Sequence, residues 1–463
     1  MKAESVPVNV ASRPSGSYTR FVSSVLFPLQ ERVKRHATVA IRRSLEESQW
    51  WTPQAIAELQ LRRLRALLVD AGGNTTYYGE LFRRAGFDPS AVTSIADLAR
   101  LPFLTKSDIR ARTEELKSRH ASRLARSNTG GSSGEPLVFY LDAERVAHDV
   151  AAKWRATRWF GVDIGDPEIV VWGSPIELGA QDRVRAVRDL LLRTALLPAF
   201  DMSESRLDDF VRRIRARRPR MLFGYPSALA HIARHAQARS IRLDDIGIEV
   251  AFVTSERLYD DQRQTIQRTF GCRVANGYGG RDAGFIAHEC PEGKMHVTAE
   301  DIVLELVDAA GEPVAAGESG EIVVTHLASR AFPFIRYRTG DFGVLAKDPC
   351  PCGRGLPVLE QILGRSTDFV VASDGTVLHG LALIYVVRDL PGIASFRIVQ
   401  ESRALTRVEL VPGPGFDPRV RSAISDGMRR RLGADVEIRI EEMATLPRER
   451  SGKHRYVVSK VAA

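Results

Sequence analysis

The chain has 463 residues, of which 44% are hydrophobic and 27% charged, as in folded globular proteins large enough for two or three domains. No apolar run reaches 18 residues, which excludes a membrane-spanning helix, and four cysteines are too few for a disulfide framework, so we expect a cytoplasmic protein. Lysine and arginine outnumber acids by 66 to 57. No nucleic-acid-binding signature accompanies the basic run 212–220, so we expect a solvated helix face and an anionic substrate, not nucleic acid.

The N-terminal part is predicted to be helical. The apolar stretch 21–29, FVSSVLFPL, lacks a small-residue cleavage site after it, so we expect a packed element and not a signal peptide. Residues 50–118 show helical apolar periodicity, clearest at 53–72, where Thr52 is placed to cap the helix and Pro53 to open it.

The pattern changes after this helical segment. Between 139 and 298, strand-like runs alternate with amphipathic helices, which predicts parallel βαβ units, and 301–345 is rich in strands. From about 366 the chain mixes short strands with one helix near 417–432. We therefore expect a mixed α/β fold. A large N-terminal domain, 1–364, combines βαβ-type sheets, a β-rich subdomain and a helical entry segment at 1–118, and a small α+β domain, 365–463, follows.

One loop, SNTGGSSGEP at 127–136, concentrates glycines and hydroxyl residues. Glycines let successive backbone N–H groups turn into one concavity, and such a nest suits phosphate oxygens. The loop is not a Walker A motif, because Glu135 stands where that motif needs lysine. A surface turn or linker would have the same composition.

Four further motifs follow this loop in a specific order: NGYGGRD (276–282), YRTGD (337–341), LGRSTDFV (363–370) and LPRERSGKHR (446–455). The order and spacing resemble the adenylate-forming superfamily, which includes acyl-CoA synthetases, adenylation domains and luciferases. Within it, the chain is most similar to the phenylacetate-CoA ligase branch, including CapK-like proteins. The resemblance runs through nearly the whole chain.

The resemblance implies an enzyme that joins a carboxylic acid to ATP with Mg²⁺, releases pyrophosphate, and then transfers the acyl group to a thiol or amine. It implies that Asp341 binds the ribose hydroxyls, Tyr278 lies against adenine with Asn276 at the base edge, and Arg365 contacts phosphate. It implies that Lys453 bridges the α-phosphate and the substrate carboxylate. It assigns the phosphate loop to Thr129, Gly130, Gly131, Ser132, Ser133 and Gly134 and adds Gly279 to the nucleotide site.

Two positions depart from the family's pattern. Asp282 stands where the family usually has a magnesium-binding Glu, and Asp is one methylene shorter. Glu135 precedes Pro136 where lysine is frequent, which removes a cation near the phosphates. Both departures put efficient adenylation in doubt.

The resemblance also implies where the acid binds and how the small domain moves. Tyr225, Phe252 and Gly280 would border the acyl pocket, although the two aromatic residues could equally be core. The hinge falls at Thr367, where Asp or Lys is more usual, and rotation there would present Lys453 for adenylation and then withdraw it.

Cys290 and His296, with Cys350 and Cys352, supply four soft or imidazole ligands, the number that a closed structural zinc site requires. Some members of the branch carry zinc there. His288 could replace His296, and the alternative is a set of thiols without metal.

Three functions therefore remain open. The first is an ATP-dependent ligase that forms a CoA thioester of an aryl or small organic acid. The second is an adenylating enzyme that passes the acyl group to an amine or a carrier protein. The third is a catalytically silent nucleotide-binding or scaffold relative. The sequence allows a monomer or a homodimer.

Overall fold

The computed structural model describes residues 16–129, 137–172, 183–199, 202, 204–365, 369–375, 377–379, 381–388, 390–446 and 456–461. Its chain forms two compact units: Met1–Thr339 with Gly343–Ile362, and Gly340–Phe342 with Leu363–Ala463. The predicted functional domains, 1–364 and 365–463, stay a prediction.

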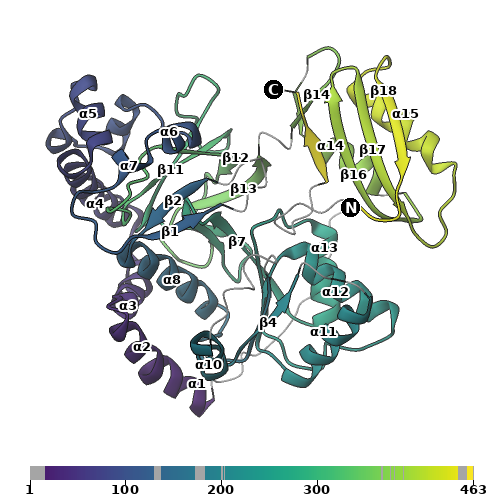
Figure 1. Ribbon diagram of the computed structural model, residues 1–463, viewed down its shortest axis with the longest axis horizontal. Helices are drawn as coiled ribbons and strands as arrows, with labels where there is room; N and C mark the ends of the chain where they lie inside the picture. Colours follow the sequence, from purple (N-terminus) through teal and green to yellow (C-terminus); the bar gives the residue numbers. More distant parts are fainter. Residues whose placement is uncertain are drawn as a thin grey trace. The chain divides into compact units, whose positions relative to one another are not determined.

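The first unit begins with helices, shown in purple and blue in Figure 1. They are α1 (Ser17–Phe21), the π-helical η1 (Val22–Leu26), α2 (Phe27–Val33), α3 (Thr38–Ser48), α4 (Pro53–Asn74), α5 (Thr76–Ala85), η2 (Pro89–Ala91), η3 (Ile95–Arg100), α6 (Lys106–Ala111) and α7 (Thr113–Leu116). The hydroxyl of Thr52 accepts a hydrogen bond from the backbone N–H of Ala55 at 3.2 Å, and Pro53 opens α4. The predicted cap and helix start are confirmed.

Strands and helices then alternate, as predicted. An antiparallel pair of strands, β1 (Ala125–Asn128) and β2 (Val138–Leu141), comes first. The elements that follow are α8 (Ala143–Arg158), β3 (Glu168–Trp172), α10 (Arg183–Leu191), β4 (Thr194–Pro198), α11 (Glu204–Arg217), β5 (Met221–Gly224), α12 (Pro226–Ala238), β6 (Val250–Thr254), α13 (Asp260–Phe270) and β7 (Arg273–Gly280). Strands β4, β3, β5, β6 and β7 pair in parallel in that order. The mixed α/β class is thereby confirmed.

Six further strands, most of whose residues belong to the first unit, extend the same sheet. They are β8 (Gly284–Glu289), β9 (Met295–Val297), β10 (Ile302–Val307), β11 (Ser319–His326), β12 (Tyr337–Leu345) and β13 (Val358–Arg365). The sheet has 11 strands in the order β10-β11-β12-β13-β9-β8-β7-β6-β5-β3-β4. The antiparallel β7–β8 hairpin joins the parallel half to the β-rich half, so residues at its turn lie where the two halves meet.

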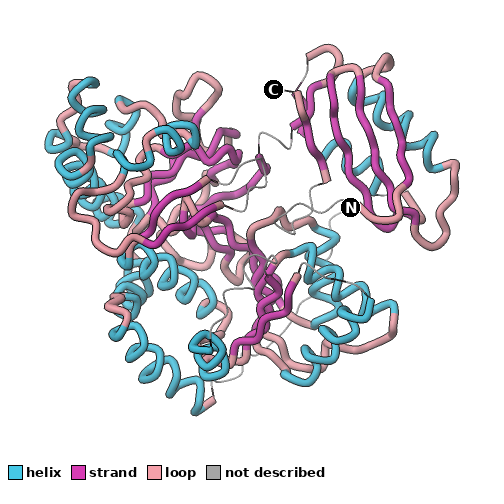
Figure 2. Tube along the Cα trace, viewed as in Figure 1, coloured by secondary structure: helices cyan, strands magenta, loops and turns pink. Residues whose placement is uncertain are grey.

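The parallel half of the sheet is covered on both faces, because neighbouring residues of a strand point to opposite sides. On β6, Ala251 and Val253 pack with apolar residues of α11, α12 and α13, whereas Val250 and Phe252 pack with Ala156 of α8. Figure 2 shows the helices beside these strands. The basic run begins on α11, where Arg212 and Arg215 are exposed and pair with Asp209 and Asp245, as expected for a solvated helix face.

The second unit contains β14 (Phe369–Val371), β15 (Val377–His379), α14 (Leu381–Arg388), β16 (Ile393–Ser402), β17 (Leu405–Pro412), α15 (Val420–Leu432), β18 (Glu437–Glu442) and β19 (Val457–Ser459). Its main sheet has four strands in the order β18-β17-β16-β19. The predicted helix near 417–432 is confirmed as α15. Among the described residues of both units, none of the helices combines the length and apolarity that crossing a membrane requires.

Candidate functional site

Two of the predicted nucleotide-binding residues lie on β7. Asn276 and Tyr278 alternate with Gly277, so they share one face of the strand, and both are half-buried. Gly277 faces the other way, where a Cβ atom would lie 2.8 Å from the ring of Phe252. The backbone N–H of Asn276 donates to a carboxylate oxygen of Glu289 at 2.8 Å, which ties β7 to the end of β8.

The β7–β8 turn requires glycine. A Cβ atom on Gly279 would lie 2.1 Å from the carbonyl oxygen of Gly284, so a larger residue would force the two strands apart. Gly280, the predicted pocket residue, is exposed at the start of the turn, and a Cβ atom there would lie 2.6 Å from Asp282 Oδ1. The two glycines therefore let the turn close beside the Asp282 carboxylate.

Asp282 is half-buried at this turn and is held through three oxygens. Its Oδ1 accepts from the N–H of Ala283 at 3.0 Å, and its Oδ2 accepts from the hydroxyl of Tyr337 at 2.6 Å. Its backbone carbonyl accepts from Arg145 Nη2 at 3.1 Å. An ionised carboxylate has about four lone-pair sites, so these bonds leave acceptor capacity for a cation. The donor chemistry fits Mg²⁺, and the magnesium role stays a prediction.

Two charged side chains of α8, neither of them predicted from the sequence, lie beneath this turn. Arg145 of α8 is fully buried, and its Nε donates to Asp149 Oδ2 at 3.1 Å. Asp149 Oδ1 in turn accepts from the N–H of Phe285 at 3.3 Å. Burial raises the pKa of Asp149, but Arg145 and His326 outweigh it and hold this pKa below its ordinary value. A charged pair on α8 therefore fixes both ends of the turn that carries Asp282.

His326 completes this group and makes it sensitive to acid. Its Nδ1 accepts from the N–H of Ala328 at 3.3 Å, and its Nε2 lies 3.7 Å from Asp149 Oδ1. Burial, with Arg145 nearby, lowers the pKa of His326 to about 4. The buried imidazole is therefore neutral at pH 7, whereas the same residue in the unfolded chain binds a proton below about pH 6.5.

We expect this difference to destabilise the protein as the pH falls below about 6.5, since only the unfolded chain takes up the proton until the pH approaches 4. Between pH 7 and pH 5, proton uptake by His326 in the unfolded chain should lower the free energy of unfolding by about 2 kcal/mol. In His326→Asn, the free energy of unfolding should fall by about 2 kcal/mol less over the same pH range. Urea unfolding midpoints at both pH values measure it. The control is His120→Gln, at an exposed histidine. If the wild type, His326→Asn and His120→Gln lost the same stability between pH 7 and pH 5, His326 would not be the source of the acid sensitivity.

Asp341, the predicted ribose-binding residue, lies on β12. Tyr337, which donates to Asp282, begins the same strand, and Gly340 precedes Asp341 with a φ of +78°, a conformation that favours glycine. The segment before α6 pairs with this strand: the N–H of Leu104 donates to the carbonyl of Arg336 at 2.9 Å. Asp341 is half-buried, and its contact with ribose stays a prediction.

The predicted phosphate loop connects β1 and β2, which pair antiparallel. At its base, the N–H of Thr129 donates to the carbonyl of Leu137, and the N–H of Leu137 donates to the Thr129 hydroxyl, both at 3.0 Å. The other loop residues, Gly130, Gly131, Ser132, Ser133, Gly134 and Glu135, lie outside the described residues. So do Thr367, Lys453 and the side chain of Arg365, and their roles stay predictions.

The two predicted aromatic pocket residues belong to one stack. The rings of Tyr225 and Trp172 lie 4.4 Å apart, those of Trp172 and Phe223 lie 5.8 Å apart, and those of Phe223 and Phe252 lie 6.0 Å apart. Tyr225 is 5% exposed and Phe252 is fully buried. The stack crosses β5, β3 and β6, and the acyl-pocket role of Tyr225 and Phe252 stays a prediction.

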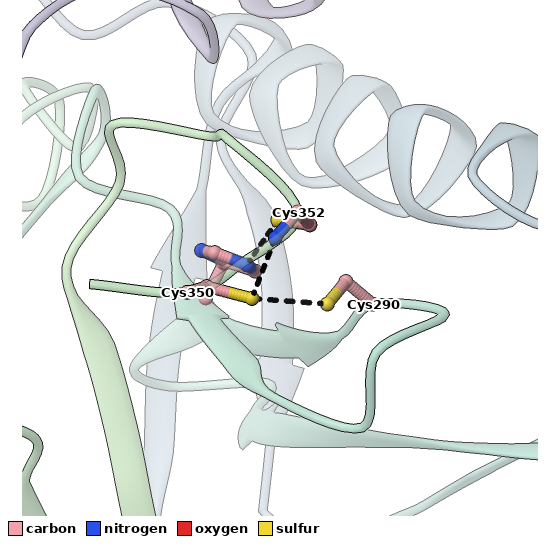
Figure 3. Close-up of side chains that lie close together, drawn as sticks. Cys290, Cys350 and Cys352 are labelled. Atoms are coloured by element: carbon pink, nitrogen blue, oxygen red, sulfur yellow. Dashed lines mark hydrogen bonds between the residues drawn. The ribbon is translucent and has the colours of Figure 1, made fainter. Parts of the chain in front are cut away.

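The four predicted zinc ligands come together. Figure 3 shows the three cysteines pointing toward one another from two separate segments. Cys290 Sγ lies 3.7 Å from Cys350 Sγ, and Cys352 Sγ lies 3.2 Å from His296 Nε2. One ligand atom from each of the four residues lies within 4.8 Å of all the others. The histidine of this group is His296 and not His288. Neither ring nitrogen of His288 has a hydrogen-bond partner among the described residues.

These distances fit a tetrahedral zinc ion, in which Zn–S bonds of about 2.3 Å place two sulfurs about 3.8 Å apart. Burial lowers the pKa of His296 to about 4, so the imidazole is neutral, as a ligand must be. Its Nδ1 lies 3.3 Å from the carbonyl of Leu356, which suits an Nδ1–H donor and leaves Nε2 to face the thiols. The geometry supports a structural metal site, and zinc itself stays a proposal.

Neighbouring residues hold the cysteine turn in place. The guanidinium of Arg354 lies 4.7 Å from the ring of Trp50 and 4.4 Å from that of Trp159. The N–H of Gly355 donates to the carbonyl of Gln49 at 3.0 Å. Burial raises the pKa of the Cys352 thiol, but hydrogen bonds from Arg354 outweigh it and lower this pKa. Arg354 therefore favours the thiolate that binds a metal.

Comparisons with known proteins agree on the architecture. The family described as the CapK C-terminal domain matches residues 370–460. Protein CapK of Staphylococcus aureus is 23% identical over 444 residues, 94% of either chain. A phenylacetate-coenzyme A ligase of Thermus thermophilus is 26% identical over 342 residues, covering 69% of this chain and 72% of its own. The structure of a 2-hydroxyisobutyryl-CoA ligase in the postadenylation state aligns with a TM-score of 0.72, at 20% identity, over 89% of this chain and 91% of that one.

Proposed function

We propose that this chain, which is similar to CapK and to the phenylacetate-CoA ligases, activates a carboxylic acid with ATP and transfers the acyl group to CoA. The observation that carries the proposal is the arrangement around Asp282, whose turn follows the β7 face with Asn276 and Tyr278 and is bonded to Tyr337. The acid itself is proposed to be an aryl or small organic acid.

The proposed reaction has two steps. A carboxylate oxygen of the acid attacks the α-phosphorus of ATP, and the bond to pyrophosphate breaks, which leaves an acyl-adenylate. The sulfur of CoA, having lost its proton, then attacks the acyl carbonyl, and AMP leaves with the electron pair of the former acyl–oxygen bond. Both reactants of the first step are anions, so the enzyme must neutralise charge where they meet.

The residues divide this work. Tyr278 and Asn276 are proposed to hold adenine, and Asp341 the ribose hydroxyls. Thr129 and the loop after it are proposed to bind the terminal phosphates through N–H groups, while Arg365 and Lys453 supply cations. Mg²⁺ bound at Asp282 would neutralise part of the triphosphate charge. Arg145 and Tyr337 keep the Asp282 oxygens in position.

We expect Asp341→Ala to raise the dissociation constant for ATP at least about a hundredfold, because two hydrogen bonds to a charged acceptor are lost and each contributes about 1.5–3 kcal/mol. Isothermal titration with a non-hydrolysable ATP analogue measures the change. Asp435→Ala, at an exposed acid of the second unit, is the matched control. Unchanged nucleotide affinity in Asp341→Ala would remove the ribose contact from the proposal.

The acyl acceptor needs a separate experiment. The similarity to a CoA ligase, that of Thermus, covers 69% of this chain, whereas the similarity to CapK, whose name gives no acceptor, covers 94%. The protein is incubated with ATP, Mg²⁺ and a carboxylic acid that it adenylates, together with either CoA or an amine. The products are identified by mass spectrometry. A thioester formed only with CoA supports the proposal. An amide, or a product formed only on a carrier protein, would replace CoA as the proposed acceptor while leaving the adenylation step in place.

The proposed location is the cytoplasm, where the thiols stay reduced.

A further inference from the structure

The N-terminal helical segment, residues 17–33 of α1, η1 and α2, packs one face against the rest of the first unit, and both polar and apolar side chains are buried on that face. Thr19 and Glu31 are buried on this face with Val22 and Phe27. The Thr19 hydroxyl donates to Asp166 Oδ1 at 2.8 Å, and the ring of Phe27 meets Trp154 edge-on at 5.1 Å. The inner face is therefore anchored to the body of the unit, and the sequence-based expectation of a packed element holds for this face alone.

The outer face of the same segment is apolar, the reverse of what a solvent-facing helix usually shows. Its residues recur every three or four positions and are 40–78% exposed: Tyr18 40%, Phe21 52%, Val25 51%, Leu29 57% and Val33 78%. At about 1.5 Å per residue, the segment is about 25 Å long. A stripe of this length and exposure marks a contact surface.

Helix α10 continues the stripe. The Tyr18 hydroxyl donates to the carbonyl of Leu191 at 2.9 Å, and Figure 1 shows α1 beside α10. Val187, Leu190 and Leu191 are 56%, 72% and 40% exposed. We call these eight residues of the two segments the outer apolar surface. The other large hydrophobic residues exposed in the described part of the chain, Trp50, Trp51 and Val69, belong to α4 or the turn before it.

The exposed charges around this surface are positive, and the acid that α10 carries, Asp189, is half-buried and pairs with Arg188. Arg20, Arg32, Lys34 and Arg35 are exposed on residues 16–36, and Arg193 lies 5.5 Å from the ring of Tyr18. The one acid of residues 16–36, Glu31, is buried and bonded to Thr38 and Lys34. An apolar stripe edged by lysine and arginine is complementary to a lipid surface with negative headgroups.

We propose that the segment 17–33, with the end of α10, lies in the plane of an anionic lipid membrane, its outer apolar surface in the headgroup region. A second copy of the chain fits less well, because a symmetric contact through this stripe would bring one set of arginines against the other. The inner face keeps its contacts to the unit, so the segment lies on the bilayer and does not cross it. The proposal is independent of the ligase activity.

The test is co-sedimentation of the full chain with sucrose-loaded vesicles, of phosphatidylcholine alone or with 30% phosphatidylglycerol. Binding is expected to the anionic vesicles and to weaken at high salt. The double variant Phe21→Ser/Leu29→Ser should lower the partition coefficient at least about tenfold. The double variant Arg20→Gln/Arg32→Gln should lower it about thirtyfold, because each arginine contributes about fivefold to binding. The controls are Val69→Ser for the apolar pair and Arg83→Gln with Arg84→Gln for the charges.

Three results would overturn the proposal. The first is absence of binding to anionic vesicles by the full chain. The second is binding that the arginine pair reduces while the apolar pair does not, which is surface adsorption without insertion. The third is a concentration-dependent dimer in analytical ultracentrifugation that Phe21→Ser with Leu29→Ser dissociates, which assigns the surface to a second copy. Circular dichroism of each variant, compared with wild type, establishes that the fold is retained.

Discussion

Replacing Lys453 by alanine is expected to lower the rate of acyl-adenylate formation by at least about 10²–10³-fold. In the proposed reaction, negative charge grows on the α-phosphate as pyrophosphate departs, and Lys453 supplies the cation that meets both this phosphate and the attacking carboxylate. The second step needs no such bridge. Thioester formation from a supplied acyl-adenylate should therefore remain close to the wild-type rate.

Acid-dependent exchange of pyrophosphate into ATP measures the first half-reaction, and release of AMP from a synthetic acyl-adenylate with CoA measures the second. Lys460→Ala is the matched control, because Lys460 is an exposed lysine near the same end of the chain and pairs with Glu401. Equal loss of both half-reactions in Lys453→Ala would show that the residue serves folding or general binding and not adenylation.

The substitution Cys350→Ser is expected to abolish zinc binding and to lower the melting temperature by about 10 °C or more. The free energy of binding a structural zinc ion is also folding free energy, about 10–16 kcal/mol in small domains, and each kcal/mol shifts the melting temperature of a large domain by about 2–4 °C. The loss should be large here because the ligands connect the end of β8 and β9 to the turn before β13.

Elemental analysis of protein purified without chelator, together with thermal melting, tests this prediction. We expect one zinc ion per chain in the wild type. The control is Cys272→Ala, a buried cysteine packed with the α12 and α13 core, which should keep its zinc. Wild-type protein without zinc, or Cys350→Ser with a full complement of zinc, would contradict the site.

Features that depend on neighbours in the sequence could be predicted. The cap at Thr52 and the helix start at Pro53 need only adjacent residues, and the alternation between 139 and 298 needs only a repeating pattern. The zinc ligands could be proposed because Cys350 and Cys352 are two residues apart and cysteine is rare in this chain. Each of these signals is local.

Features that depend on distant pairing could not be predicted. Arg145 and Tyr337 meet Asp282 across separations of 137 and 55 residues, and a single sequence contains no sign of such partners. A buried arginine is also unexpected, because its charge is stable there only through Asp149 and the carbonyl that it bonds. Likewise, the apolar stretch 21–29, which lacks a cleavage site after it, indicated a packed element but could not tell which face would stay exposed.

The proposed adenylation is best measured as ATP–pyrophosphate exchange by the wild-type protein, with Mg²⁺, across a panel of aryl, fatty, hydroxy and amino acids. We expect exchange that depends on one acid or a narrow group of acids, most of all an aryl or small organic acid. No exchange with any acid of a broad panel, in protein that still binds ATP, would contradict an adenylating enzyme and favour the non-catalytic relative.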